Sequence, residues 1–378
     1  MAAAVSFRRC CLWKNSRSLS APLRGNSTGH RALWRGFRSS VTRPDGHTWD
    51  RGEAPENQDY CLQLVRSRDY EGLVCSLLFP EEARRSSLAL RAFNVELAQV
   101  KDSVSQKTIG LIRMQFWKTA VEEMYRDEPP KQPVSAELWR AVRKHHLTKS
   151  WLLRIIRERE KDLEDRAYRN LSELETYSEN TQSSLLYLLL EAVGIKDVHA
   201  DHAASHIGKA QGIVTCLRAT PYHCSRRRVY LPMDLCLQHG VSQEQFLRFS
   251  REQSVRDVVF DIASQAHAHL QHARSFRHNV PPHAAPAFLH TVSLEDYLQR
   301  LRRVDFDVFH PSLQKRNPLL AIRLVWRREV YGPYLSVRVG RCSWRSRYSG
   351  EGEWALPGDY GCVYVCNDVD VPSLFLGL

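Results

Sequence analysis

Three histidines are spaced so that a helix would bring their imidazoles onto one face. They are His199, His202 and His206, with Asp201 among them. Imidazoles at steps of three and four residues can hold zinc or iron, but a polar helix face or a network at a helix end gives the same pattern. We take the polar face as the interpretation, so we expect no metal ligands and no cofactor.

A second histidine group lies further along the chain. It comprises His267, His269 and His272, which do not share one helix face. We interpret these three side chains as ordinary surface groups.

Arginines near residue 220 could bind phosphate. Arg218 precedes the run Arg226–Arg228, and Tyr230 follows it. The guanidinium fork matches phosphate oxygens without the help of a metal. Arg218, Arg228 and Tyr230 are therefore candidate contacts for a phosphate or lipid ligand. A solvated loop and a patch that docks a partner protein are the alternatives.

The alternating Arg/Glu stretch at residues 154–166 has a simpler explanation. Such alternation is typical of a solvated helix face with ion pairs four residues apart. We assign it no chemistry.

Charge is concentrated at the N-terminus. Residues 1–44 hold nine basic side chains and no Asp or Glu, which is typical of a mitochondrial presequence rather than a merely disordered tail. Residues 45–57 are the predicted linker. The rest of the chain carries 45 basic against 42 acidic side chains, so we expect no nucleic-acid partner. No apolar run is long enough to span a bilayer, so any membrane contact would be peripheral.

Apolar periodicity predicts helices from about Asp59 to Arg303, and therefore an all-α domain. One stripe, which follows Pro80, contains Leu90, Phe93, Leu97 and Val100. A second stripe contains Ile109, Ile112, Phe116, Ala120 and Met124. Gly208 and Gly212 are four residues apart and predict the close approach of another backbone. Residues 327–378 lose the helical period and are interpreted as a tail of short strands or disorder.

The order of these segments resembles the squalene/phytoene synthase family, which has the all-α isoprenoid synthase fold. Arg228-Val229-Tyr230-Leu231-Pro232 matches a signature of that family, and Arg218 fits its arginine. The resemblance covers the predicted domain, residues 58–326. It implies two aspartate-rich motifs on facing helices, which hold magnesium and thereby the diphosphate of a prenyl substrate.

Both of these motifs are degraded here. The first reads Ala98-Gln99-Val100-Lys101-Asp102, with one carboxylate left. In the second, the acidic positions fall on Ala219 and His223. Tyr177 of the family's substrate channel is kept, but Ser178-Glu179-Asn180 follows it. Because one aspartate cannot assemble a magnesium site, we predict a pseudoenzyme without catalytic residues.

Four further runs resemble the mitochondrial branch of the family that serves the assembly of respiratory complex I. They are residues 113–118, 200–209, 216–223 and 304–311. This resemblance implies a matrix protein at the inner membrane, acting early on complex I subunits or other assembly factors, in support of a mitochondrially encoded membrane-arm subunit. The alternatives are a module that binds a lipid or prenyl phosphate and a prenyltransferase with a remodelled site.

Overall fold

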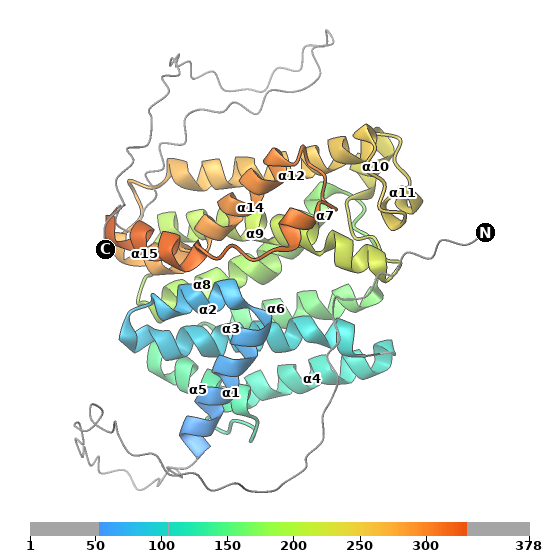
Figure 1. Cartoon of the computed structure of the whole chain (residues 1–378). Helices are drawn as coiled ribbons and strands as arrows, with labels where there is room; N and C mark the ends of the chain where they lie inside the picture. Colours follow the sequence, from blue (N-terminus) through green and yellow to red (C-terminus); the bar gives the residue numbers. More distant parts are fainter. Residues whose placement is uncertain (1–52, 105, 331–378) are drawn as a thin grey trace, which may run out of the picture. The chain divides into compact units, whose positions relative to one another are not determined.

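The computed structural model describes residues 53–104 and 106–330 of the chain. The predicted presequence, residues 1–44, and residues 331–378 of the predicted tail lie outside the described residues. All of the described elements are helical, and no strand occurs among them, which confirms the predicted all-α class (Figure 1).

The first half of the described chain contains six α-helices followed by a 3-10 turn. They are α1 (Glu53–Arg68), α2 (Tyr70–Leu77), α3 (Glu81–Ser103), α4 (Lys107–Met124), α5 (Pro133–His145), α6 (Lys149–Lys161) and η1 (Asp162–Glu164). A continuous helical run comes next, formed by α7 (Leu171–Ser178), the π-helical segment η2 (Glu179–Ser183) and α8 (Ser184–Ala192). Gly194 ends this run with φ at +81°, as its position predicts.

The second half begins with α9 (Val198–Ser225), a helix of 28 residues. The remaining elements are α10 (Met233–Gln238), α11 (Gln243–Leu247), α12 (Gln253–Ser275), η3 (Pro282–Ala284), α13 (Ala285–Phe288), α14 (Thr291–Arg303), η4 (Pro311–Gln314) and α15 (Leu320–Val330).

Helix α9 joins two hydrophobic cores. Its N-terminal half, including Ala203 and Ile207, packs into a core built with α1, α3, α5, α6 and α8. Its C-terminal half, including Ile213 and Leu217, packs into a second core with α12 and α14. Figure 1 shows α9 between α12 and the layer that contains α3 and α6.

The two glycines of α9 make the close contact that their spacing predicts. A Cβ atom on Gly208 would lie 2.4 Å from the backbone nitrogen of Ser183, and one on Gly212 would lie 1.9 Å from the Oγ of Ser178. Because no side chain fits at these positions, the glycines allow α9 to pack directly against the α7–η2 helix.

Helix α3 follows its prediction. Pro80 is the N-cap residue, Glu81 and Glu82 occupy the first turn, and the predicted stripe is buried. Acidic side chains are stabilised at the positive end of the helix dipole, and proline is tolerated there because its nitrogen needs no partner.

The predicted stripe of α4 is half wrong. Ala120 and Met124 are buried, but Ile109, Ile112 and Phe116 are exposed, Ile112 by 64%. The inward face of α4 is instead made by other residues, which include Gly110, Met114, Trp117 and Val121. Both faces of this helix carry apolar residues at helical spacing, so periodicity alone picked the wrong one at the N-terminal end.

Two predicted boundaries differ from the helix ends. Helix α1 begins at Glu53, inside the predicted linker 45–57, because Glu53 and Pro55 suit a first helical turn. Helix α15 ends at Val330, four residues beyond the predicted end of the domain. In the described part of the chain, no helix combines the length and apolarity needed to cross a bilayer.

Candidate functional site

A cavity of about 500 Å³ is lined mainly by α2, α3 and α9. Helix α3 contributes Asn94, Ala98, Gln99 and Asp102, and the start of α2 contributes its N-cap residue Asp69 and Glu71. Helix α9 contributes Gln211, Thr215 and Arg218. Most of the lining is polar or charged, so this cavity suits a polar ligand better than an apolar chain.

The structure brings the first degraded motif into this cavity. Ala98, Gln99 and Asp102 recur at helical spacing on one face of α3 and line the space together. Lys101 turns away from them: its Nζ atom lies 3.1 Å from an oxygen of Asp162 and over the ring of Tyr230. One carboxylate of this motif therefore remains, whereas the family resemblance implies an aspartate-rich cluster.

The second motif meets the first, as expected for facing helices. Arg226, just beyond the end of α9, places Nη1 3.8 Å from Oδ1 of Asp102. His223 packs edge to face against Tyr230, with ring centroids 4.7 Å apart. Burial lowers the pKa of His223, so its ring is neutral near neutral pH.

The residues at these positions do not fit a magnesium ion. A hard divalent cation needs several oxygen ligands that no other cation neutralises. Here the remaining aspartate is paired directly with Arg226, and the positions of the lost acids are Ala219 and His223, neither of which offers an oxygen from its side chain. A salt bridge stands where the resemblance predicts a metal between two acidic motifs.

Arg218 lies in the cavity, but its guanidinium is occupied. It donates two hydrogen bonds to the carboxylate of Glu71, at 2.6 and 2.9 Å. Burial opposes the charge of Glu71, but the hydrogen bonds and positive charge of Arg218 outweigh burial and lower the pKa of Glu71 to about 2. The arginine that was predicted to bind phosphate is thus paired with a carboxylate of the same chain.

The three residues predicted to bind phosphate, Arg218, Arg228 and Tyr230, do not lie together. Arg228 and Tyr230 do not line the cavity; both contact Asp165, Arg228 at 3.2 Å and Tyr230 through a short hydrogen bond from its hydroxyl. Arg218 is therefore the one member of the set that faces the cavity. The three side chains do not form one anion site.

Sequence reasoning missed Arg159, which belongs to the stretch predicted to be solvated. This side chain lines the cavity and donates a hydrogen bond of 2.6 Å to the hydroxyl of Tyr177. Arg154 likewise contacts Asn180 on the π segment rather than solvent alone. The interpretation of 154–166 as a free surface is wrong at these positions, because a charge alternation does not reveal which side chains another helix covers.

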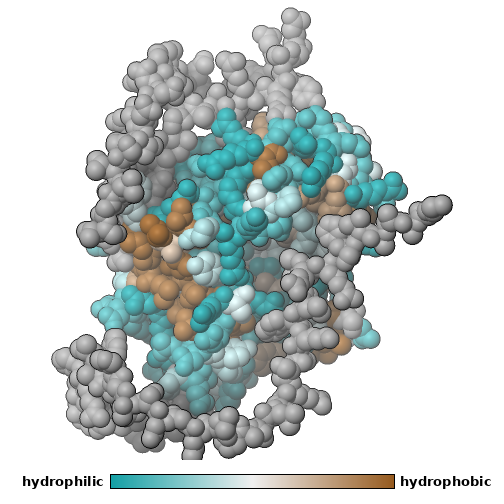
Figure 2. Space-filling view, in the orientation of Figure 1, coloured by the Kyte–Doolittle hydropathy of each residue, from teal (hydrophilic) through white to brown (hydrophobic). Residues whose placement is uncertain are grey.

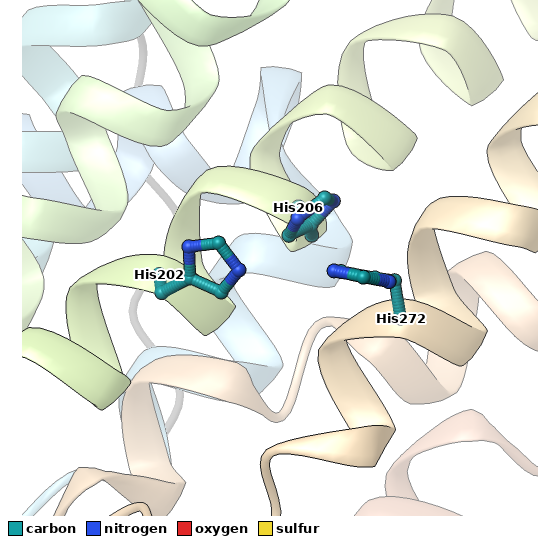
Figure 3. Close-up of side chains that lie close together, drawn as sticks. All are labelled: His202, His206 and His272. Atoms are coloured by element: carbon teal, nitrogen blue, oxygen red, sulfur yellow. The ribbon is translucent and has the colours of Figure 1, made fainter. Parts of the chain in front are cut away.

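The histidines are arranged differently from the prediction. His202 and His206 of α9 meet His272 of α12, and their ligand atoms lie within 4.8 Å of one another (Figure 3). His269 is buried and contacts both His206 and Glu175, so the interpretation of the second group as surface histidines is wrong for it. The signal was present in part, since His269 and His272 are three residues apart.

The all-helical fold defines a protein of the isoprenoid synthase class. The family model for squalene/phytoene synthase matches residues 65–325. The chain belongs to that family.

Solved structures share the fold at low sequence identity. The crystal structure of squalene synthase HpnC from Alicyclobacillus acidocaldarius aligns with a TM-score of 0.60 at 19% identity, covering 67% of this chain and 96% of that one. A dehydrosqualene synthase aligns with a TM-score of 0.64 at 14% identity, covering 74% and 97%. At such identity the likeness concerns the fold alone.

Curated relatives are far more similar in sequence. The chain is 71% identical over 277 residues to "NADH dehydrogenase (ubiquinone) complex I, assembly factor 6" of Rattus norvegicus, which covers 72% of this chain and 83% of that protein. The Homo sapiens protein of that name is 70% identical, and a Drosophila melanogaster homolog is 41% identical; 82% of each is covered.

Proposed function

We propose that this protein is a non-catalytic factor in the assembly of mitochondrial respiratory complex I. The observation that carries the proposal is the 71% identity, over 83% of its length, to a relative that bears the name of complex I assembly factor 6. We further propose that the protein acts early in assembly and supports a mitochondrially encoded membrane-arm subunit. Its partners are complex I subunits or other assembly factors, on the matrix side of the inner membrane.

The cavity supports a binding role rather than catalysis. Prenyl transfer in this fold needs the charge of a departing diphosphate to be neutralised by metal ions. In this chain Asp102 is paired with Arg226, and Arg218 is paired with Glu71. The ion pairs thus occupy the groups that would hold the metal and the diphosphate, which disfavours the remodelled prenyltransferase.

The lipid-binding alternative finds less support in this cavity. A module that presents a prenyl chain would need a closed, apolar space. The cavity is open, and its apolar lining residues are Val95, Ala98 and Leu320. A small polar ligand would fit this lining better.

An exposed apolar surface supports peripheral contact with the inner membrane. Leu319, Ile322 and Val325 are all exposed on or next to α15, and Arg323 lies among them. Helix α15 packs beside α2, where Leu77 is exposed as well. Figure 2 shows a brown, apolar area over this part of the molecule. A helix that combines aliphatic and basic residues is suited to the headgroup region of a membrane.

The experiment is deletion of the gene in cells, followed by native-gel analysis of the respiratory complexes. An isolated loss of complex I, restored by the full chain, is the expected result. Rescue by the chain ending at residue 330 tests whether the described domain suffices. Uniform loss of all respiratory complexes, or normal complex I, would contradict the proposal.

Two rescue variants separate the mechanisms. Asp102→Asn, which removes the last carboxylate of the first motif, should rescue as well as the wild-type chain if no metal chemistry is needed. A matched surface variant, Glu244→Gln, controls for expression, since Glu244 pairs only with a neighbour on its own short segment. Failure of Asp102→Asn alone would favour the enzyme.

A further inference from the structure

We propose that His202, His206 and His272 form a binding site for a divalent transition-metal ion, with zinc as the first candidate. The site lies between α9 and α12, is distinct from the cavity, and is independent of the proposed function.

The geometry of the three rings is that of an open metal site. His202 and His206 are one helical turn apart on α9, and His272 faces them from α12. Figure 3 shows the rings directed into one space between the two helices. The ring centroids of His206 and His272 are 4.2 Å apart, and those of His202 and His206 are 4.9 Å apart.

Small rotations of the side chains would close the site. Zinc binds imidazole nitrogen at about 2.0–2.1 Å, so tetrahedral ligand atoms lie roughly 3.3 Å from one another. The three ligand atoms here already lie within 4.8 Å of one another. His202 and His272 are exposed, so a water molecule can reach the fourth position.

A chain of hydrogen bonds orients the ring of His206. Nδ1 of His206 lies 2.9 Å from Nδ1 of His269, and Nε2 of His269 lies 3.1 Å from a carboxylate oxygen of Glu175. Because Glu175 accepts, His269 donates from Nε2; in the tautomer whose Nδ1 accepts, the donor is Nδ1 of His206. The Nε2 atom of His206 then keeps its electron pair for a metal. Metal-binding histidines in proteins are held in this way by a second layer of partners.

An aromatic side chain borders the three imidazoles. Phe276 packs against the rings of His202 and His272, at 4.5 and 5.3 Å between centroids. The aromatic contact restricts the rings to the space that they share.

The donor set selects the class of metal. Three imidazoles suit zinc, copper, nickel and cobalt, whereas magnesium and calcium require oxygen ligands. Among the described residues, this is the one set of three or more His, Cys, Asp or Glu side chains with ligand atoms this close. The ion would tie α9 to α12, two helices that both contribute to the second core.

The test is a titration of the metal-free full-length chain with Zn²⁺ by calorimetry, and with Co²⁺ followed by visible absorption. We expect one ion per chain and an absorption spectrum of low-coordinate cobalt. His206→Ala and His272→Ala should each weaken Zn²⁺ binding at least ten-fold. His269→Gln should weaken it roughly ten- to hundred-fold, as is typical when a second-layer partner is lost. His199→Ala, an exposed histidine on the same helix, is the matched control and should change nothing.

A thermal measurement keeps the test independent of misfolding. Zn²⁺ should raise the melting temperature of the wild-type and His199→Ala chains, because it binds only the folded state. It should not raise that of His272→Ala, whose own melting temperature without metal should match the wild type. Absence of Zn²⁺ uptake by the wild-type chain would overturn the proposal, as would uptake that His272→Ala leaves unchanged.

Discussion

Glu71 and Arg218 lie 147 residues apart in the chain and join through two hydrogen bonds across one wall of the cavity. Arg218 matches an arginine of the family and is one of the three residues predicted to contact a phosphate or lipid ligand. In this protein its two terminal nitrogens are turned to a carboxylate of the same chain. The positive charge is therefore a structural link between α2 and α9, and it is already neutralised before any ligand arrives.

The Glu71–Arg218 pair should make the free energy of unfolding depend on pH. The pKa of Glu71 is lowered to about 2 in the folded state, below its ordinary value of about 4.3. The pair therefore contributes stability above that ordinary value and loses it as the pH falls toward about 2. Glu71→Gln should lower the free energy of unfolding by about 2–3 kcal/mol near neutral pH.

Urea unfolding at several pH values checks this prediction. The difference between the wild-type chain and Glu71→Gln should shrink as the pH falls. Glu244→Gln removes an exposed partner of Arg248 and should cost no more than about 0.5 kcal/mol. A difference between wild type and Glu71→Gln that is independent of pH would contradict the assigned role of the pair.

Alanine at the α9 glycines should destabilise the fold for two different reasons. In an uncrowded helix interior, Gly→Ala stabilises by about 1 kcal/mol. Here the added Cβ would meet backbone atoms of Ser183 at position 208, and the Ser178 side chain at position 212. We expect Gly212→Ala to lower the free energy of unfolding by about 1–3 kcal/mol. Gly208→Ala should lower it by about 3 kcal/mol or more.

A second substitution at the contacted serine distinguishes a clash with a side chain from a clash with the backbone. Ser178→Gly should recover part of the loss in Gly212→Ala, because it removes the atoms that the new methyl group meets. Ser183→Gly should not rescue Gly208→Ala, since the backbone remains. Gly110→Ala on α4 is the control, because its Cβ would meet only the flexible side-chain ends of Leu163 and Val104. Equal rescue in both pairs would refute this account of the packing.

The purified chain should not consume prenyl diphosphates in the presence of Mg²⁺. The physical reason is that Asp102 is the only carboxylate of the first motif and lies 3.8 Å from the guanidinium of Arg226. Product formation would be followed by chromatography, beside an active family enzyme as the positive control. Turnover that disappears in Asp102→Asn would restore the prenyltransferase reading.

The exposed face of α15 should govern binding to membranes. Ile322→Ser together with Val325→Ser removes two exposed aliphatic side chains, each worth about 1 kcal/mol or more when buried. Sedimentation with vesicles that contain anionic lipid should show at least a ten-fold loss of binding, with the melting temperature unchanged. The matched control is Ile109→Ser with Ile112→Ser on α4, also exposed. Equal loss in both double variants would mean that α15 has no special role.

Apolar periodicity was sufficient to predict most of the helices and the buried face of α3. It failed at α4, where Ile112 and Met114 have similar hydrophobicity but opposite environments. Periodicity records that a helix has an apolar stripe, but the neighbouring helices decide which stripe is covered. Periodicity is equally uninformative for Arg159. Its charge suggested a solvent-exposed side chain, but this side chain lines the cavity.

The prediction that the chain lacks a magnesium site depends on residue types alone, because no fold can supply a carboxylate at Ala98 or Ala219. The close contact at Gly208 was also local information, since only glycine leaves room for another backbone. What the tertiary structure decided was pairing over long distances: Glu71 with Arg218, and His272 with His202 and His206. Such pairs depend on how whole helices pack, and the spacing of residues within one helix carries no record of the side chains that another helix brings to it.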